Sequence, residues 1–117
     1  MFDQENKKIE EDNSLLILDD DEPFLKRLSK AMEKRGFRVF PANSIHELDR
    51  IIELNVPNYA VIDLRLNDGT GLDAIEKIKS RNTNSKIVVL TGYGAISTAV
   101  AAVKIGAIDY LAKPADA

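Results

Sequence analysis

Three aspartates, Asp19, Asp20 and Asp21, stand in a row directly after the apolar run 15–18. Like charges this close repel one another and destabilise a fold unless a cation lies among them. Oxygen ligands at this density suit Mg²⁺, which takes one or two carboxylates and keeps several waters for a phosphate partner. The next question is whether other residues complete a site for phosphate chemistry.

Three further polar residues, Asp63, Thr91 and Lys113, each follow an apolar run of strand length. Segments with helical periodicity separate these runs, and strands that alternate with helices form a parallel sheet covered on both faces. Ligands of such sheets bind beyond the carboxyl ends of the strands. We therefore expect one edge of the sheet to gather Asp19, Asp20, Asp63, Thr91 and Lys113.

These side chains suit phosphoryl transfer. An aspartate can attack phosphorus and form an acyl phosphate. Mg²⁺ would neutralise the carboxylates, while a lysine ammonium and a threonine hydroxyl would each contact a phosphoryl oxygen. Taken singly, Asp63 fits a turn, Thr91 a helix N-cap and Lys113 an exposed surface, and acidic runs are usually solvated. Their shared edge favours the functional interpretation.

The composition excludes several classes of protein. The chain has 117 residues and a net charge of −3, and it contains no cysteine, which excludes disulfides and a cysteine nucleophile. The acidic excess lies in residues 1–14, so the rest is neutral, which argues against nucleic-acid binding within it. No apolar run reaches the roughly 18–20 residues of a membrane span, and the polar N-terminus is unlike a signal peptide. We expect a cytoplasmic protein without membrane contact.

Residues 1–14 are polar and aperiodic, and we interpret them as a mobile tail before one domain at 15–117. Ser44 and Glu47 have the spacing of a capping box, and Gly69 and Gly71 indicate a loop. A helix usually follows the last strand of such a sheet; we expect it to be missing here and to leave an apolar strip exposed. The expected strands are 15–18, 38–40, 59–62, 87–90 and 108–112, and the expected helices are 22–35, one that begins after Ser44, 72–79 and 95–105.

Some motifs carry no function in this interpretation. The glycine pairs at 69–71 and 92–94 lack the spacing of a dinucleotide-binding loop, and no phosphate-binding loop of the nucleoside triphosphatases is present. His46 falls on a polar helix face, where we expect it to be solvated.

Four motifs together resemble those of a known family. They are LILDDD at 16–21, VIDLRL at 61–66, VLTG at 89–92 and DYLAKP at 109–114. In this order and spacing they resemble the receiver domain of a bacterial two-component response regulator, over about residues 14–115. The resemblance implies a flavodoxin-like α/β fold, with a doubly wound five-stranded parallel sheet in the order 2-1-3-4-5.

The resemblance also implies a role for each site residue. Asp63 would accept a phosphoryl group from a phosphohistidine on a sensor histidine kinase. Asp20 would ligate Mg²⁺ directly, Asp19 would do so through water, and the backbone carbonyl of Arg65 would supply a further ligand beside Asp63. The domain would mediate its own phosphorylation and dephosphorylation without being counted as an enzyme.

The remaining implied roles concern the switch. Thr91 and Lys113 would bind the phosphoryl group, Thr91 would swing inward, and Tyr110 would follow it. Asp21 matches a variable position and could instead cap the first helix. The bond before Pro114 is expected to be cis, as in the family.

Two departures from the family are visible. Many receivers have proline four residues after the phosphoacceptor, where this chain has Asn67. Arg65 and Tyr93 occupy variable positions that set the access of water, and because both are large we expect a long-lived acyl phosphate.

The sequences of four segments resemble those of the RegA/ActR/PrrA type of transcription regulator in alphaproteobacteria. These segments are 21–25, 31–37, 90–96 and 109–116. These regulators pair with a redox-responsive membrane kinase and bind DNA through a C-terminal helix-turn-helix domain, which these residues do not contain. The resemblance also implies a homodimer on phosphorylation.

Two other classes stay open from the residues alone. A phosphatase with an aspartyl-phosphate intermediate would use Asp19 as nucleophile with Asp21 two residues on, although no cap domain or later acidic motif accompanies them. A phosphate-independent interaction module would have a purely structural pocket.

Overall fold

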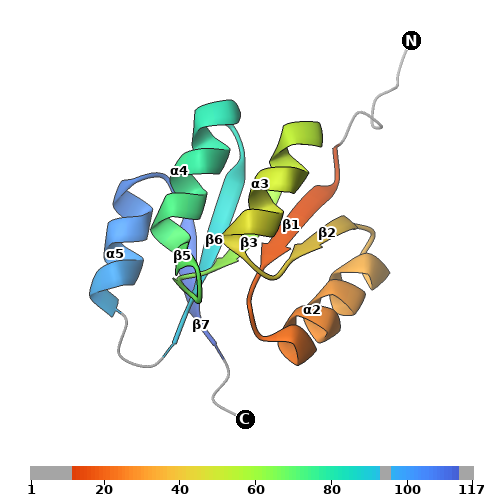
Figure 1. The fold of residues 1–117 in the computed structure, drawn as a ribbon, viewed down its shortest axis with the longest axis horizontal. Coiled ribbons are helices and arrows are strands. Elements are labelled where there is room, and N and C mark those ends of the chain that lie inside the picture. The colour runs from red at the N-terminus through yellow and green to blue at the C-terminus, as the bar shows by residue number, and fades with distance from the viewer. Residues whose placement is uncertain (1–11, 93–95, 114–117) are drawn as a thin grey trace.

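The computed structural model describes residues 12–92 and 96–113, in which five parallel strands form one sheet in the spatial order β2-β1-β3-β6-β7 (Figure 1). Counted along the sheet strands alone, this is the predicted order 2-1-3-4-5, which is confirmed. The bounds are β1 Ser14–Leu18, β2 Arg38–Ala42, β3 Tyr59–Asp63, β6 Lys86–Thr91 and β7 Asp109–Ala112.

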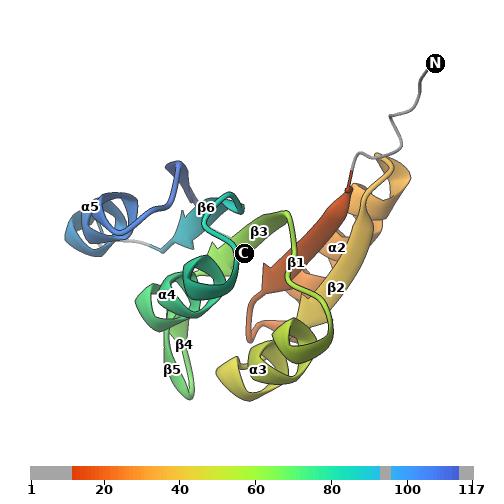
Figure 2. The same ribbon diagram turned by 90° about the horizontal axis from the view of Figure 1, so that it is seen from above.

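Four helices of the described residues cover the sheet. The bounds are α2 Glu22–Lys34, α3 Ile45–Leu54, α4 Gly71–Arg81 and α5 Ile96–Lys104. Seen from above, α2 lies on one side of β1 and β2, whereas α3, α4 and α5 follow one another along the opposite face (Figure 2). The predicted alternation of strands and helices is confirmed.

The side chains of β1 show why both faces need cover. Successive side chains of a strand point to opposite faces. Leu15 and Ile17 pack with Leu25 of α2 in one apolar cluster, and Leu16 and Leu18 belong to a larger cluster beneath α3, α4 and α5. All five side chains of β1 are buried, so this strand runs through the centre of the molecule and fixes the place of the aspartates after it.

Local signals set most helix ends as expected. The Ser44 hydroxyl accepts the N–H of Glu47 at 3.1 Å, and the Glu47 carboxylate accepts the N–H of Asn43 at 2.9 Å, which completes a capping box one residue early. Gly36, with φ +100°, follows the end of α2. The strand predicted at 38–40 continues to Ala42 through Pro41, which an edge strand tolerates.

A short hairpin was not predicted from the sequence. The strands β4 Arg65–Leu66 and β5 Gly69–Thr70 pair antiparallel between β3 and α4, in a segment interpreted as a loop. Two-residue strands are too short to show a period. The hairpin turn is fastened to α3 because Asp68 accepts the N–H of Ile45 at 3.0 Å and that of His46 at 3.2 Å.

Gly71 is the first residue of α4 and packs tightly beneath the hairpin. A Cβ at this position would lie 2.7 Å from the carbonyl oxygen of Asp63 and 2.8 Å from Cα of Leu64. The Gly71 N–H also donates to the Leu64 carbonyl at 3.0 Å. Close approach of two backbones therefore requires glycine here.

Apolar side chains are exposed on α5, on β7 and in the segment 105–108 between them. The largest exposures among them are those of Ile108, at 59%, Leu111 and Ile96, both at 57%. Whether a missing helix accounts for this surface stays a prediction.

Ser14, which the sequence places in the tail, is buried as the first residue of β1. The other tail residues up to 11, Tyr93 and the predicted cis bond at Pro114 lie outside the described residues. No helix in the described part is long and apolar enough to cross a membrane.

Candidate phosphoryl-transfer site

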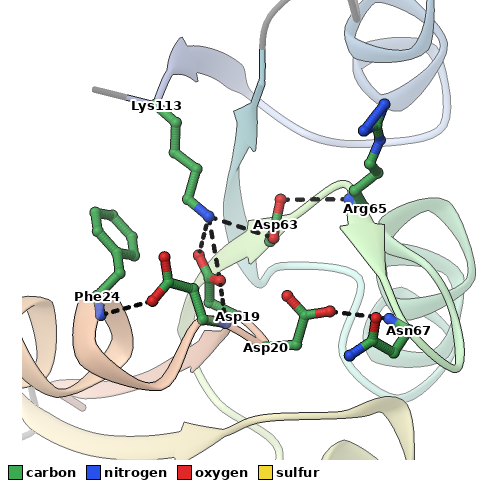
Figure 3. Close-up of polar contacts among 8 residues, drawn as sticks. Asp19, Asp20, Phe24, Asp63, Arg65, Asn67 and Lys113 are labelled. Atoms are coloured by element: carbon green, nitrogen blue, oxygen red, sulfur yellow. Dashed lines mark hydrogen bonds and ion pairs between the residues drawn. The ribbon is translucent and has the colours of Figure 1, made fainter. Parts of the chain in front are cut away.

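The structure brings four of the predicted residues together at one edge of the sheet (Figure 3). The ammonium Nζ of Lys113 lies 2.9 Å from Asp19 Oδ2, 3.2 Å from Asp19 Oδ1 and 3.5 Å from Asp63 Oδ2. Asp19, Asp20 and Asp63 each present one carboxylate oxygen, and these oxygens lie within 4.8 Å of one another. The predicted cluster of acids beside one lysine is therefore present.

Strand register explains this convergence. Leu18 of β1 pairs with Ile62 of β3, so Asp19 and Asp63, the next residues, emerge side by side. Lys113 follows β7 and reaches the site because its backbone N–H donates to the carbonyl of Thr91 at 2.8 Å. The side chain of Asp19 is fully buried and that of Asp63 is 7% exposed, so both carboxylates depend on polar partners within the protein.

The cluster shifts the protonation of two of its members. Burial, and after it the charge of Asp19, raise the pKa of Asp63 to about 6, although the Arg65 N–H and the charge of Lys113 oppose this rise. Burial by itself would lower the pKa of Lys113, but the hydrogen bond to Asp19 and the charge of Asp63 outweigh it, so the pKa is raised. Lys113 is therefore the charged cation of the cluster.

Replacing Asp63 with asparagine is expected to stabilise the metal-free protein. The folded-state pKa of about 6 exceeds the ordinary 3.8, so the folded state binds more protons and the parent loses stability as pH rises through this interval. Asparagine does not ionise, so the variant avoids this loss. We expect its free energy of unfolding to exceed that of the parent by about 1–2 kcal/mol at pH 7.5 and to equal it near pH 4. Urea unfolding in chelator at both pH values measures it; an equal gain at both would contradict this origin.

The acids fit a divalent cation. Asp19 Oδ2 is buried and accepts no hydrogen bond, because Lys113 approaches it only as an ion pair and directs its hydrogen bond to Oδ1. A buried carboxylate oxygen without a hydrogen bond is costly. Together with Asp20 and Asp63 it offers the hard oxygen ligands that Mg²⁺ and Ca²⁺ prefer.

Two neighbouring residues orient these carboxylates. The backbone N–H of Asn67 donates to Asp20 Oδ2 at 3.0 Å, which proline at this position could not do. The Asp21 N–H donates to Asp19 Oδ1 at 2.9 Å, while Asp21 Oδ1 accepts the N–H of Phe24 at 3.2 Å. Asp21 is thus the N-cap of α2, as its alternative interpretation predicted, and not a further ligand.

In the described residues, the side chains of three other predicted residues form no hydrogen bond or ion pair with the carboxylates. Thr91 is buried as the last residue of β6, and its hydroxyl donates to the Gly92 carbonyl at 3.0 Å. Tyr110 is 36% exposed on β7. The N–H of Arg65 donates to Asp63 Oδ1 at 3.3 Å, and its side chain points away from the acids (Figure 3). The implied roles of all three, including the Arg65 carbonyl as a ligand, stay predictions.

The site opens to solvent through a depression of about 410 Å³. Asp63, Asp20 and Lys113 line it, whereas Asp19 lies behind them. An incoming group would therefore meet Asp63 before Asp19. The full lining consists of Asp20, Asp21, Asp63, Arg65, Leu66, Asn67, Gly92 and Lys113.

Phe24 is one residue of this region that the sequence analysis missed. The Nζ of Lys113 lies 4.8 Å from the centroid of its ring. Phe24 was interpreted only as part of the apolar stripe of α2. An aromatic residue in the first turn after an aspartate cap could have drawn attention, but its contact with Lys113 joins positions that only the fold brings together.

Comparison with known proteins defines the class. Residues 15–117 match the model of the response regulator receiver domain, and the chain belongs to that family. It is 65% identical over 106 residues to the photosynthetic apparatus regulatory protein RegA of Cereibacter sphaeroides, covering 91% of this chain and 58% of that protein. The acid tolerance regulatory protein ActR of Rhizobium meliloti is 59% identical over 106 residues, with coverage of 91% and 55%. The predicted resemblance to the RegA and ActR regulators is confirmed, and the chain spans less than two thirds of either relative.

Solved structures agree with this family. A response regulator of Burkholderia pseudomallei, solved with a phosphorylated aspartic acid, a calcium ion and citrate, superimposes with a TM-score of 0.82 at 38% identity, over 90% of this chain and 62% of that one. A CheY-like receiver domain protein of Methanospirillum hungatei gives a TM-score of 0.81 at 30% identity, over 89% and 83%.

Proposed function

We propose that Asp63 is the phosphoacceptor of this receiver domain and that its phosphorylation operates a switch. The observation that carries the proposal is the position of Asp63, which lines the depression beside a lysine and two further acids. Its neighbours Asp19 and Asp21 are occupied by the lysine and by the cap of α2. Asp63 is therefore the carboxylate best placed to react.

The reaction is the transfer of a phosphoryl group from a histidine nitrogen to a carboxylate oxygen. A carboxylate oxygen of Asp63 attacks phosphorus, and the bond from phosphorus to the histidine nitrogen of a sensor kinase breaks, with its electron pair leaving on the imidazole. The product is an acyl phosphate on Asp63. Lys113, already 3.5 Å from Asp63, contributes a cation to one phosphoryl oxygen, and Thr91 contributes a hydroxyl once it turns from Gly92.

Mg²⁺ is the cofactor we propose for the acidic cluster. Asp19, Asp20 and Asp63 would hold it, with the Arg65 carbonyl as a further ligand, and it would neutralise charge on the phosphoryl oxygens. The calcium ion in the Burkholderia pseudomallei regulator supports a divalent cation in this family.

The output of the switch is proposed by analogy with the longer relatives. The acyl phosphate carries about two negative charges in place of the single charge of the carboxylate, and its oxygens attract Thr91 and Lys113 and bias the segment before α5, with Tyr110 following. We propose a cytoplasmic transcription regulator that is not an enzyme, which pairs with a sensor histidine kinase, dimerises on phosphorylation and contacts DNA through sequence outside this chain. The names of RegA and ActR as regulatory proteins support this output.

The test is mass spectrometry after incubation with acetyl phosphate, with Mg²⁺ and with chelator in parallel. We expect a single phosphoryl adduct in Mg²⁺ and none in chelator. Steady hydrolysis of small phosphoesters would instead favour the phosphatase with an aspartyl-phosphate intermediate. A folded protein that binds no Mg²⁺ and forms no adduct would favour the phosphate-independent interaction module.

The lifetime of the acyl phosphate is expected to depend on Arg65. Its side chain is exposed at the rim of the depression, two residues after Asp63, and we propose that it turns over the phosphoryl group and restricts the approach of water. We expect Arg65→Asn to accelerate loss of the phosphoryl group severalfold, measured by the decay of the adduct after the phosphodonor is removed. A variant that decays no faster than the parent would show that Arg65 does not shield the phosphoryl group.

A further inference from the structure

The contact between Lys113 and Phe24 has no part in the chemistry proposed above. The ammonium lies over the ring at 4.8 Å from its centroid (Figure 3). A cation within about 6 Å of the centroid is attracted by the negative face of the ring. The contact therefore holds the cation of the site from the side of α2.

The backbone of Lys113 gives its ammonium little support, and the contacts with Asp19 and Asp63 hold it from the side of the acids alone. Lys113 follows β7, an edge strand in which all four residues are exposed, and the hydrogen bond to Thr91 fixes its N–H alone. The four-carbon stem of lysine is flexible, so this anchor leaves the ammonium free to sample many positions. Contacts at the far end of the side chain must select the position that serves the reaction.

Phe24 is placed before any ligand arrives. Its N–H donates to the Asp21 carboxylate at 3.2 Å, and Pro23 precedes it in the first turn of α2. The ring is half-buried and rises from a helix end that is fixed by its cap. Its face is thus a preset surface for the ammonium.

The chemistry of the ring suits this pocket. Three carboxylates already crowd the site, and a fourth would hold the lysine more tightly while adding repulsion. A neutral aromatic ring attracts the cation without adding charge, so the ammonium stays available to a phosphoryl oxygen. Leucine would fill similar space without this attraction.

We infer that Phe24 is a positioning residue for phosphorylation, whose ring holds the Lys113 ammonium over the carboxylates before the phosphodonor binds. The inference rests on the proposed function of Asp63. Phe24 acts through Lys113 and itself touches no reacting atom. Its contribution is the orientation of one cation.

Phe24→Leu and Phe24→Tyr form a matched pair, because leucine keeps an apolar side chain and tyrosine keeps the ring. With acetyl phosphate in saturating Mg²⁺, we expect the initial rate of adduct formation to fall about fivefold in Phe24→Leu and to stay within about twofold of the parent in Phe24→Tyr. Thermal unfolding verifies that both variants are folded. An unchanged rate in Phe24→Leu, or equal losses in both variants, would overturn the inference.

A second measurement needs no phosphodonor. In the parent and in Phe24→Tyr, the ring should shift the NMR signals of the Lys113 ε-methylene protons upfield, and in Phe24→Leu this shift should disappear. Absence of the shift in the parent would also overturn the inference. A parent that shows the shift but forms no adduct would instead refute the proposed function of Asp63.

Discussion

Asp63→Asn is expected to abolish the phosphoryl adduct, with a loss of more than about a thousandfold in the rate of its formation. Asparagine keeps the size of the side chain and an oxygen to accept the Arg65 N–H, but its amide is not a nucleophile toward phosphorus. The variant should be folded and, without metal, more stable than the parent. Loss of the adduct would therefore be chemical in origin, and mass spectrometry with acetyl phosphate and Mg²⁺ measures it.

Asp21→Asn provides the matched control for this experiment. It neutralises an acid in the same cluster region, but Asp21 serves as the cap of α2, and asparagine caps helices equally well. We expect its rate to stay near that of the parent. An adduct that persists in Asp63→Asn and disappears in Asp19→Asn would make Asp19 the nucleophile and would support the phosphatase alternative.

Gly71→Ala is expected to damage both stability and reactivity. Its new Cβ would lie 2.7 Å from the Asp63 carbonyl oxygen and 2.8 Å from Leu64 Cα, and backbone atoms cannot yield as a flexible side chain does. Overpacking of this kind costs about 1–3 kcal/mol, against which the helix preference of alanine returns less than about 1 kcal/mol. We expect a net loss of about 2 kcal/mol in urea unfolding and more than about a tenfold slower adduct formation, because the backbone of Asp63 must move.

Gly69→Ala separates this effect from a general effect of glycine replacement. At Gly69 the nearest atom to a new Cβ is Cγ1 of the Ile45 side chain at 3.1 Å, which can yield by a few tenths of an ångström. We expect a smaller loss of stability there and little change in the rate. Equal behaviour of the two variants would show that the contact of Gly71 with Asp63 is not what matters.

Sequence patterns predicted what depends on period and order along the chain. Apolar runs of strand length gave the alternation of elements, and the alternation placed Asp19, Asp63 and Lys113 at one edge. The hairpin β4–β5 could not be predicted, because four paired residues are too few to show a period. Its turn is also held by Asp68, which binds residues more than twenty positions away in the sequence.

Details of orientation also lay beyond the sequence. The Thr91 hydroxyl donates to Gly92, and the Lys113 ammonium is drawn toward buried Asp19 more closely than toward Asp63. The orientations of both side chains depend on competing hydrogen bonds and charges a few ångströms apart. The sequence shows that Asn67 stands where many receivers have proline. It does not show that the N–H of Asn67 donates to Asp20.

The ion pair between Asp19 and Lys113 joins residues 94 positions apart, near the two ends of the domain. Closing a loop of this length carries a large entropic cost, and contacts so distant in sequence tend to form late in folding. A chain still emerging from the ribosome, or one partly unfolded, has Asp63 but lacks the lysine beside it. Under the proposed function, we therefore expect a chain that has not yet brought Lys113 to Asp19 to be phosphorylated poorly.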